Sequence, residues 1–200
     1  MKRKVQVLFF MLPVIIAQAQ VKTTEKTPNL GFLRAVEIVL ADFPYNYNHI
    51  TGDLVLSQGE FEQYASTVSL PGSLSCLVGR YHSELDSTAS WQAVMYSCEE
   101  FGNAAAQYKQ LFHELKGCHL KMSDGSVYYL DGKFEEATDD MPFVSSALTV
   151  QSADERYKDF KVEIELLYQV DKWVININMV SKKKDDEIRP DWMTEKKLSN

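Results

Sequence analysis

Apolar residues recur every three or four positions in two segments of this 200-residue chain. The first segment, 29–43, follows Thr27 and Pro28, residue types typical of a helix N-cap and of the first helical position. The second, 100–116, is followed by Gly117, at a position where helices often have a glycine cap. The spaced apolar residues are Phe32, Leu33, Val36, Val39, Leu40 and Phe43 in the first segment and Ala104, Tyr108, Leu111, Phe112 and Leu115 in the second. This spacing predicts two amphipathic helices.

Elsewhere, apolar and polar residues alternate, which is typical of strands with one buried face. The alternating segments are 60–70, 74–83, 90–99, 160–168 and 173–179, and shorter strand-like segments are 119–123, 126–130 and 146–151. The Asp-Gly pairs at 124–125 and 131–132 predict turns, and a turn at 171–172 would join the last two strands. The segment 44–59 lacks alternation and is predicted to be a connection with an apolar patch at 54–56.

These patterns predict one α+β domain over residues 27–182, with two helices packed on one face of an antiparallel sheet. The order of elements is consistent with two α-plus-sheet halves, near 27–99 and 100–182, with three strands in the first half and at least four in the second. No sequence identity between the halves supports a repeat. A polar lead, 20–26, and a polar C-terminal tail, 183–200, flank the domain.

The N-terminal residues have the three parts of a secretory signal peptide. Basic residues at 2–4 precede a thirteen-residue apolar run, 5–17, and Ala17-Gln18-Ala19 supplies an A-x-A site. The run is shorter than the roughly 18 apolar residues that a membrane-spanning helix requires. We therefore expect cleavage after Ala19 and a secreted or periplasmic location. The chain contains no N-x-[ST] sequence, which favours a bacterial source.

Charge narrows the classes of partner. Without the predicted signal peptide, the chain has 18 basic and 28 acidic side chains, a net charge of about −10. A negative field repels nucleic-acid phosphates and anionic membrane surfaces, so neither is an expected partner. Hydrophobic residues make up 45% of the chain, which is enough to fill a core.

Three cysteines, an odd number, leave three possible disulfide pairings in an exported protein. A hairpin of 74–83 and 90–99 centred near Ser87 would place Cys76 opposite Cys98, within bridging distance. The pairing of Cys98 with Cys118 is disfavoured because the second predicted helix would separate them by about 25 Å. A bridge between Cys76 and Cys118 stays open, as does the interpretation that all three are buried free thiols.

Sequence signatures of catalysis are not found. The chain has no G-x-S-x-G, no G-x-G-x-x-G, no phosphate-binding G-K-[ST] and no acidic calcium loop. The nearest metal-like group, His113 with Cys118 and His119, lacks ligand spacing. No catalytic, cofactor-binding or metal-binding residues are predicted, and no cofactor is expected.

One loop has the polar and aromatic composition of recognition surfaces: Tyr45, Asn46, Tyr47, Asn48 and His49. It is the candidate binding loop, although its tyrosines could instead fold back on the first helix. The main functional hypothesis is a non-enzymatic exported module that binds an unknown protein, peptide or envelope component. Two alternatives are a carrier of a small apolar ligand and an envelope hydrolase. The carrier would have a cavity lined by Phe160, Ile164, Trp173 and Ile175, and the hydrolase would need a cleft that gathers two of His49, His82, His113 and His119 with an acid.

Overall fold

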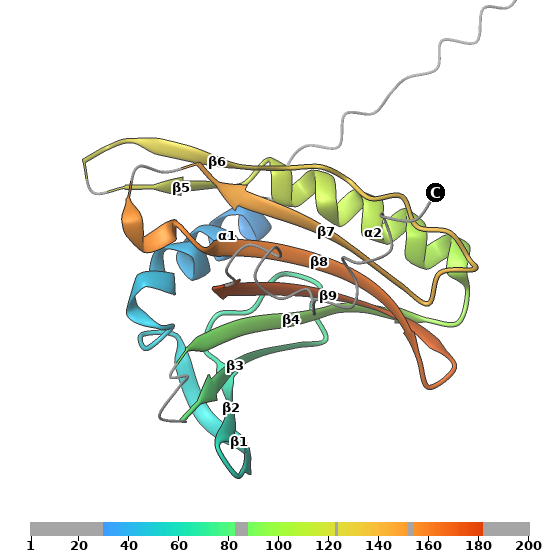
Figure 1. Ribbon diagram of the computed structural model, residues 1–200, viewed down its shortest axis with the longest axis horizontal. Coiled ribbons are helices and arrows are strands. Elements are labelled where there is room, and N and C mark those ends of the chain that lie inside the picture. Colours follow the sequence, from blue (N-terminus) through green and yellow to red (C-terminus); the bar gives the residue numbers. More distant parts are fainter. Residues whose placement is uncertain (1–29, 83–87, 123, 152–153, 182–200) are drawn as a thin grey trace, which may run out of the picture.

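The computed structural model describes residues 30–82, 88–122, 124–151 and 154–181. These residues form two α-helices and nine strands in a single antiparallel sheet (Figure 1). The helices are α1 (Leu30–Asp42) and α2 (Phe101–Lys116), and the strands are β1 (Thr51–Gln58), β2 (Phe61–Ser66), β3 (Ser75–Tyr81), β4 (Ala89–Cys98), β5 (His119–Lys121), β6 (Val127–Gly132), β7 (Phe143–Val150), β8 (Phe160–Gln169) and β9 (Lys172–Ser181). The predicted α+β class with an antiparallel sheet is confirmed. The predicted signal peptide (1–19), lead (20–26) and tail (183–200) lie outside the described residues.

The order of strands in the sheet is β1-β2-β3-β4-β9-β8-β7-β6-β5. The first four strands therefore occupy one side of the sheet and the last five the other. The two groups meet at β4 and β9, whose pairing runs from Trp91 opposite Met179 to Cys98 opposite Trp173. Strands β4 and β9 therefore lie at the centre of the sheet.

The helices bury the apolar faces that their spacing predicts. Helix α2 contacts β4, β6, β8 and β9, while α1 contacts β5 and α2, and both helices lie behind the sheet in Figure 1. Tyr108 of α2 is fully buried, and its hydroxyl lies 2.6 Å from Ser146 Oγ on β7. Ser146 lies opposite Ile164 on β8, which lies opposite Ile177 on β9, so this row faces α2. The residues between them point to the opposite side, here called the outer face.

One strand was not predicted. The segment 44–59, expected to be a connection, contains the eight-residue strand β1. Strand β1 is at the end of the sheet and pairs with β2 alone, with irregular register between Thr51 and Leu54 and between Leu54 and Leu56. Because such a strand is exposed on both faces, it does not need alternating residues, and its sequence lacks the periodic signal.

The turn predicted at the Asp-Gly pair 131–132 is also wrong, because these two residues form the end of strand β6. Gly132 pairs with Leu148 on β7. A Cβ atom at this glycine would lie 2.1 Å from the carbonyl oxygen of Ala147, so only glycine allows the two backbones to approach so closely. The pair at 124–125 does form the predicted turn between β5 and β6.

We expect Gly132→Ala to lower the free energy of unfolding by about 2 kcal/mol, because the methyl group forces β6 away from β7. Urea denaturation measures the loss. Gly102→Ala is the control, since a Cβ there meets no atom within 4 Å, and its effect should be small. Equal stability of Gly132→Ala and the unmodified protein would contradict the β6–β7 register.

The hairpin of β8 and β9 turns one residue earlier than predicted. Its two central residues are Val170 and Asp171, with φ of 48° and 61°. Two positive φ values are typical of a type I′ turn, which favours Asn or Gly. Val170 is β-branched and 92% exposed, so it bears the strain of this conformation without packing in return.

We therefore expect Val170→Gly to raise the free energy of unfolding by about 1 kcal/mol, equivalent to roughly 2–4 °C in Tm. Thermal unfolding followed by circular dichroism measures the change. Val170→Ala serves as a control because it keeps a Cβ at positive φ and should gain less. A lower Tm for Val170→Gly would show that the side chain of Val170 contributes stability.

The expected opposition of Cys76 and Cys98 is wrong. Cys76 lies opposite Ala93, whereas Cys98 lies beyond the paired part of the β3–β4 hairpin, opposite Trp173 on β9. The hairpin is centred closer to β3 than expected, and this shifts the register. All three cysteines are free thiols in the structure. Burial raises the pKa of Cys118 to about 12, so its thiol is protonated at neutral pH and unreactive.

Candidate functional site

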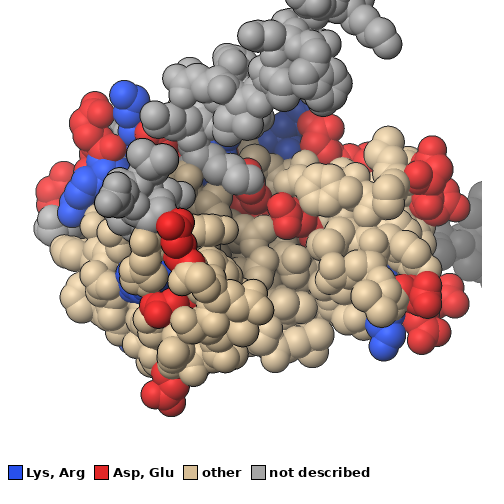
Figure 2. Space-filling view, turned by 60° about the horizontal axis from the view of Figure 1, so that its bottom comes forward, with Lys and Arg blue, Asp and Glu red and all other residues tan. Residues whose placement is uncertain are grey.

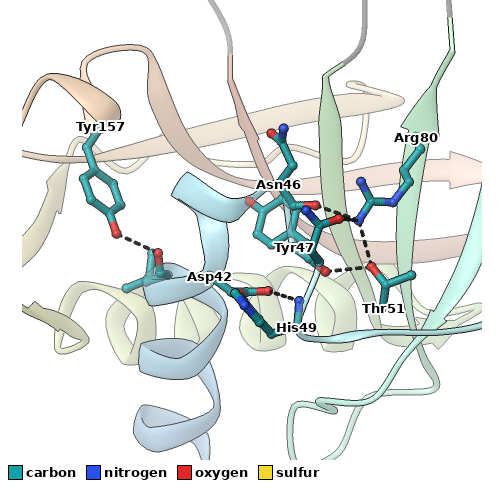
Figure 3. A network of polar contacts seen from close by, with 9 residues as sticks. Asp42, Asn46, Tyr47, His49, Thr51, Arg80 and Tyr157 are labelled. Atoms are coloured by element: carbon teal, nitrogen blue, oxygen red, sulfur yellow. Dashed lines mark hydrogen bonds and ion pairs between the residues drawn. The ribbon is translucent and has the colours of Figure 1, made fainter.

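The candidate binding loop is anchored to the core (Figure 3). Tyr47 is fully buried, and its hydroxyl donates a hydrogen bond of 2.9 Å to the carbonyl oxygen of Met179 on β9. Asn46 and Tyr47 both have positive φ, 52° and 56°, and this left-handed turn directs the ring of Tyr47 inward. Burial, the largest cause, raises the pKa of Tyr47 well above its usual range. Tyr47 is therefore a structural residue.

Asp42 and Arg80 hold the rest of the loop (Figure 3). The Asp42 carboxylate lies 2.5 Å from His49 Nδ1 and accepts a hydrogen bond from the His49 backbone N–H at 3.1 Å. Arg80 on β3 donates to the Asn46 carbonyl oxygen and the Asn48 side chain, both at 2.8 Å, and to Thr51 Oγ1 at 3.0 Å. These contacts tie the loop to α1 and to β3.

Tyr45 is the predicted loop residue with an exposed aromatic ring, at 52% exposure, and it packs edge-on against His49 at 5.0 Å. A pocket of about 130 Å³ lies beside it, lined by Ala41, Pro44, Tyr45, Leu120, Lys121, Met122, Arg156 and Tyr157. Arg156 is bound to both carboxylate oxygens of Asp154. The pocket is smaller than the roughly 300 Å³ at which small-molecule sites begin, so the geometry offers a shallow surface contact.

The four histidines considered for an enzyme site, of which at least two would have to meet in a cleft with an acid, lie in separate surroundings. His49 pairs with Asp42, and His82 Nε2 lies 2.8 Å from Glu62. A hydrogen bond from Tyr64, and then the contact with His82, lower the pKa of Glu62. The ring of His113 lies beside Phe112 and Phe134, and the ring of His119 lies beside Tyr129. Among the described residues, no group of three or more His, Cys, Asp or Glu is placed to hold a metal ion.

The four residues expected to line a carrier's cavity belong instead to the packed core between sheet and helices. Phe160, Ile164 and Ile175 are at most 1% exposed, and Trp173 is 7% exposed. Trp173 packs edge-on against Phe101 of α2 at 5.0 Å. These side chains therefore stabilise the fold.

Three exposed aliphatic side chains lie on β1. Leu54, Val55 and Leu56 are consecutive and are 55%, 58% and 37% exposed. Figure 2 shows one face of the molecule, where uncharged side chains cover most of the surface and acidic side chains lie around a hollow. The sequence located the apolar patch at 54–56 but did not show that it lies on an edge strand.

A polar group at the centre of the outer face, here called the amide–carboxylate cluster, was not predicted from the sequence. It consists of Gln92 on β4, Glu163 and Glu165 on β8, and Asn176 and Asn178 on β9. Gln92 Nε2 donates to Asn178 Oδ1, and Asn178 Nδ2 donates to Glu165 Oε2, both at 2.8 Å. The alternating pattern of 160–168 and 173–179 predicted that the two glutamates and the two asparagines lie on the polar face of their strands. Only the pairing register of β4, β9 and β8 shows that they are neighbours.

Comparison with known proteins does not assign a family or a function to this chain. In the described residues, neither helix is long and apolar enough to span a bilayer. No family model matches the chain, and no curated protein or solved structure is significantly similar to it.

Proposed function

We propose that this protein is an exported, non-enzymatic binding module that binds an extended segment of another protein by adding it as a strand to β1. One observation carries the proposal: three consecutive aliphatic residues are exposed on an eight-residue strand at the end of the sheet. Strand addition uses the backbone groups of such an edge for affinity, and it uses the side chains for specificity.

The two ends of the sheet differ in a way that favours β1 as the binding edge. We propose that the fold consists of two α-plus-sheet halves that meet at β4 and β9, so that β1 and β5 are the two ends. Strand β5 has three residues, and a short strand is a common protection against unwanted pairing. Strand β1 is longer, and Asp53 is its one charged residue.

The partner is proposed to be a different protein and not a second copy. The two register irregularities of β1 interrupt the regular ladder that two identical edges would form. The chain also has a net charge of −7, so copies of it repel one another. A selective partner with its own complementary segment fits this edge better.

Site-specific photo-crosslinking in the native host tests the proposal. A photoreactive amino acid at position 55 should form a covalent product with one partner protein. The same group at position 127 or 170 should not, although Val127 and Val170 are also exposed, at 44% and 92%. Identical products from all three positions, or a product with the mass of two copies of this chain, would overturn the proposal. The mass of the isolated protein tests export, because the mature chain is expected to begin at Gln20.

A further inference from the structure

The register of three strands builds the amide–carboxylate cluster. Gln92 lies opposite Asn178, which lies opposite Glu163, and Asn176 lies opposite Glu165 in the next row. Directly opposed side chains on one face have Cβ atoms about 4.5–5.5 Å apart, so these polar groups are neighbours. The two rows lie on the outer face, away from α2.

Asn176 distinguishes this cluster from an ordinary polar surface. It is 9% exposed, and its Oδ1 atom is buried with no hydrogen-bond partner in the described structure. Buried polar atoms are nearly always paired, since an unpaired one loses its hydrogen bonds to water without replacement. An unpaired acceptor on the residue opposite Glu165 indicates that a hydrogen-bond donor belongs there.

The neighbouring charges specify the kind of donor. Glu165 is half-buried and lies directly opposite Asn176, while Glu163 is 9% exposed and lies in the neighbouring row, opposite Asn178. Two carboxylates of β8 therefore lie on the same face of the sheet as the side chain of Asn176. The hydrogen-bond chain from Gln92 through Asn178 ends on Glu165 and directs its donors toward that carboxylate. The site therefore presents acceptors and negative charge, which complement a cationic donor.

We propose that the amide–carboxylate cluster binds a primary ammonium group, as found on a lysine side chain or an alkyl diamine. An ammonium group has three N–H donors and no acceptor, whereas Asn176 Oδ1 is an acceptor and an ionised carboxylate can accept several hydrogen bonds at once. A divalent cation fits less well, because calcium takes six to eight oxygen ligands. This site rests on observations separate from those for β1, and either proposal can fail alone.

Titration of the full chain with 1,5-diaminopentane and with N-acetyl-lysine methylamide at pH 7 tests the site, with N-acetyl-norleucine methylamide as the uncharged control. The side-chain amide NMR signals of Asn176 and Asn178 should shift saturably with the amines and not with the control compound. A response to the lysine compound alone would identify a peptide as the source of the ammonium group, and a response to the diamine alone would identify a free amine.

Three variants make the test specific. Asn176→Leu removes the unpaired oxygen and should weaken amine binding at least tenfold while raising Tm, because the buried acceptor is lost. Glu163→Gln should also weaken amine binding at least tenfold, as measured by the signals of Asn176 and Asn178, and this variant should retain the fold. Glu136→Gln removes an equal charge from a 71%-exposed side chain elsewhere and should leave binding unchanged.

Any one of three results would overturn the proposal. The amide signals could show no saturable shift with either amine, Glu136→Gln could weaken amine binding as much as Glu163→Gln does, or Asn176→Leu could bind the amines as tightly as the unmodified protein. A saturable response to calcium chloride without a response to the amines would instead identify a metal site.

Discussion

Val55→Lys is expected to weaken binding of the partner protein by about thirtyfold or more, a loss of about 2 kcal/mol that is typical of a central interface residue. A lysine at this position adds a charge to the edge, and edge lysines hinder the pairing of further strands. Because Val55 is 58% exposed, the stability of the folded chain should change by no more than about 0.5 kcal/mol. Once cross-linking has identified the partner protein, titration of each variant with the purified partner measures the affinity.

Val127→Lys is the matched control for this result. It makes the same change on β6, where Val127 is 44% exposed and pairs with Lys121 on β5. It should leave the affinity unchanged. If both variants weaken binding equally, added positive charge and not the β1 edge would be the cause.

Alkaline pH is expected to destabilise the protein strongly, by about 3 kcal/mol or more between pH 8 and pH 11. Burial is the main cause that raises the pKa of Tyr108, Tyr157 and Cys118 to about 12, from ordinary values near 10 for tyrosine and 9 for cysteine. In the unfolded chain these groups lose their protons first. The unfolded state is therefore favoured as pH rises above about 9, and the stabilising contribution is fully present only below that value.

Urea denaturation at a series of pH values measures this effect. Tyr157→Phe removes one of the groups, together with the hydrogen bond from its hydroxyl to the carbonyl oxygen of Leu40. This variant should be less stable at pH 8 but should lose less stability between pH 8 and pH 11. Equal unfolding free energies of the unmodified protein at the two pH values would contradict the burial of these groups.

Periodic segments were predictable because most of their apolar side chains lie on one face. Helix α2 and the β8–β9 hairpin each direct most of their apolar side chains to the face between sheet and helices, and this imposes a spacing on the sequence. Strand β1 buries neither face and leaves no such signal. The Cys76–Cys98 pairing failed for a different reason, since it depended on the centre of a hairpin whose loop length the sequence does not specify.

The candidate site was predictable only in part. The composition of the 45–49 loop suggested recognition, but the positive φ of Tyr47, which turns its ring into the core, is a backbone property that composition does not encode. The amide–carboxylate cluster depends on the pairing of β4 with β9, residues about 80 positions apart in the chain. Such distant pairing follows from the whole fold, so no local pattern could reveal the unpaired oxygen of Asn176.

Hydrogen exchange of the β1 amides, with and without the cross-linked partner's binding segment, tests the central claim most directly. Strand addition predicts that amides of residues 51–58 that do not donate to β2 exchange at least tenfold more slowly in the complex, because the new strand accepts their hydrogen bonds. Protection confined to the 45–49 loop, with unchanged exchange along β1, would contradict it.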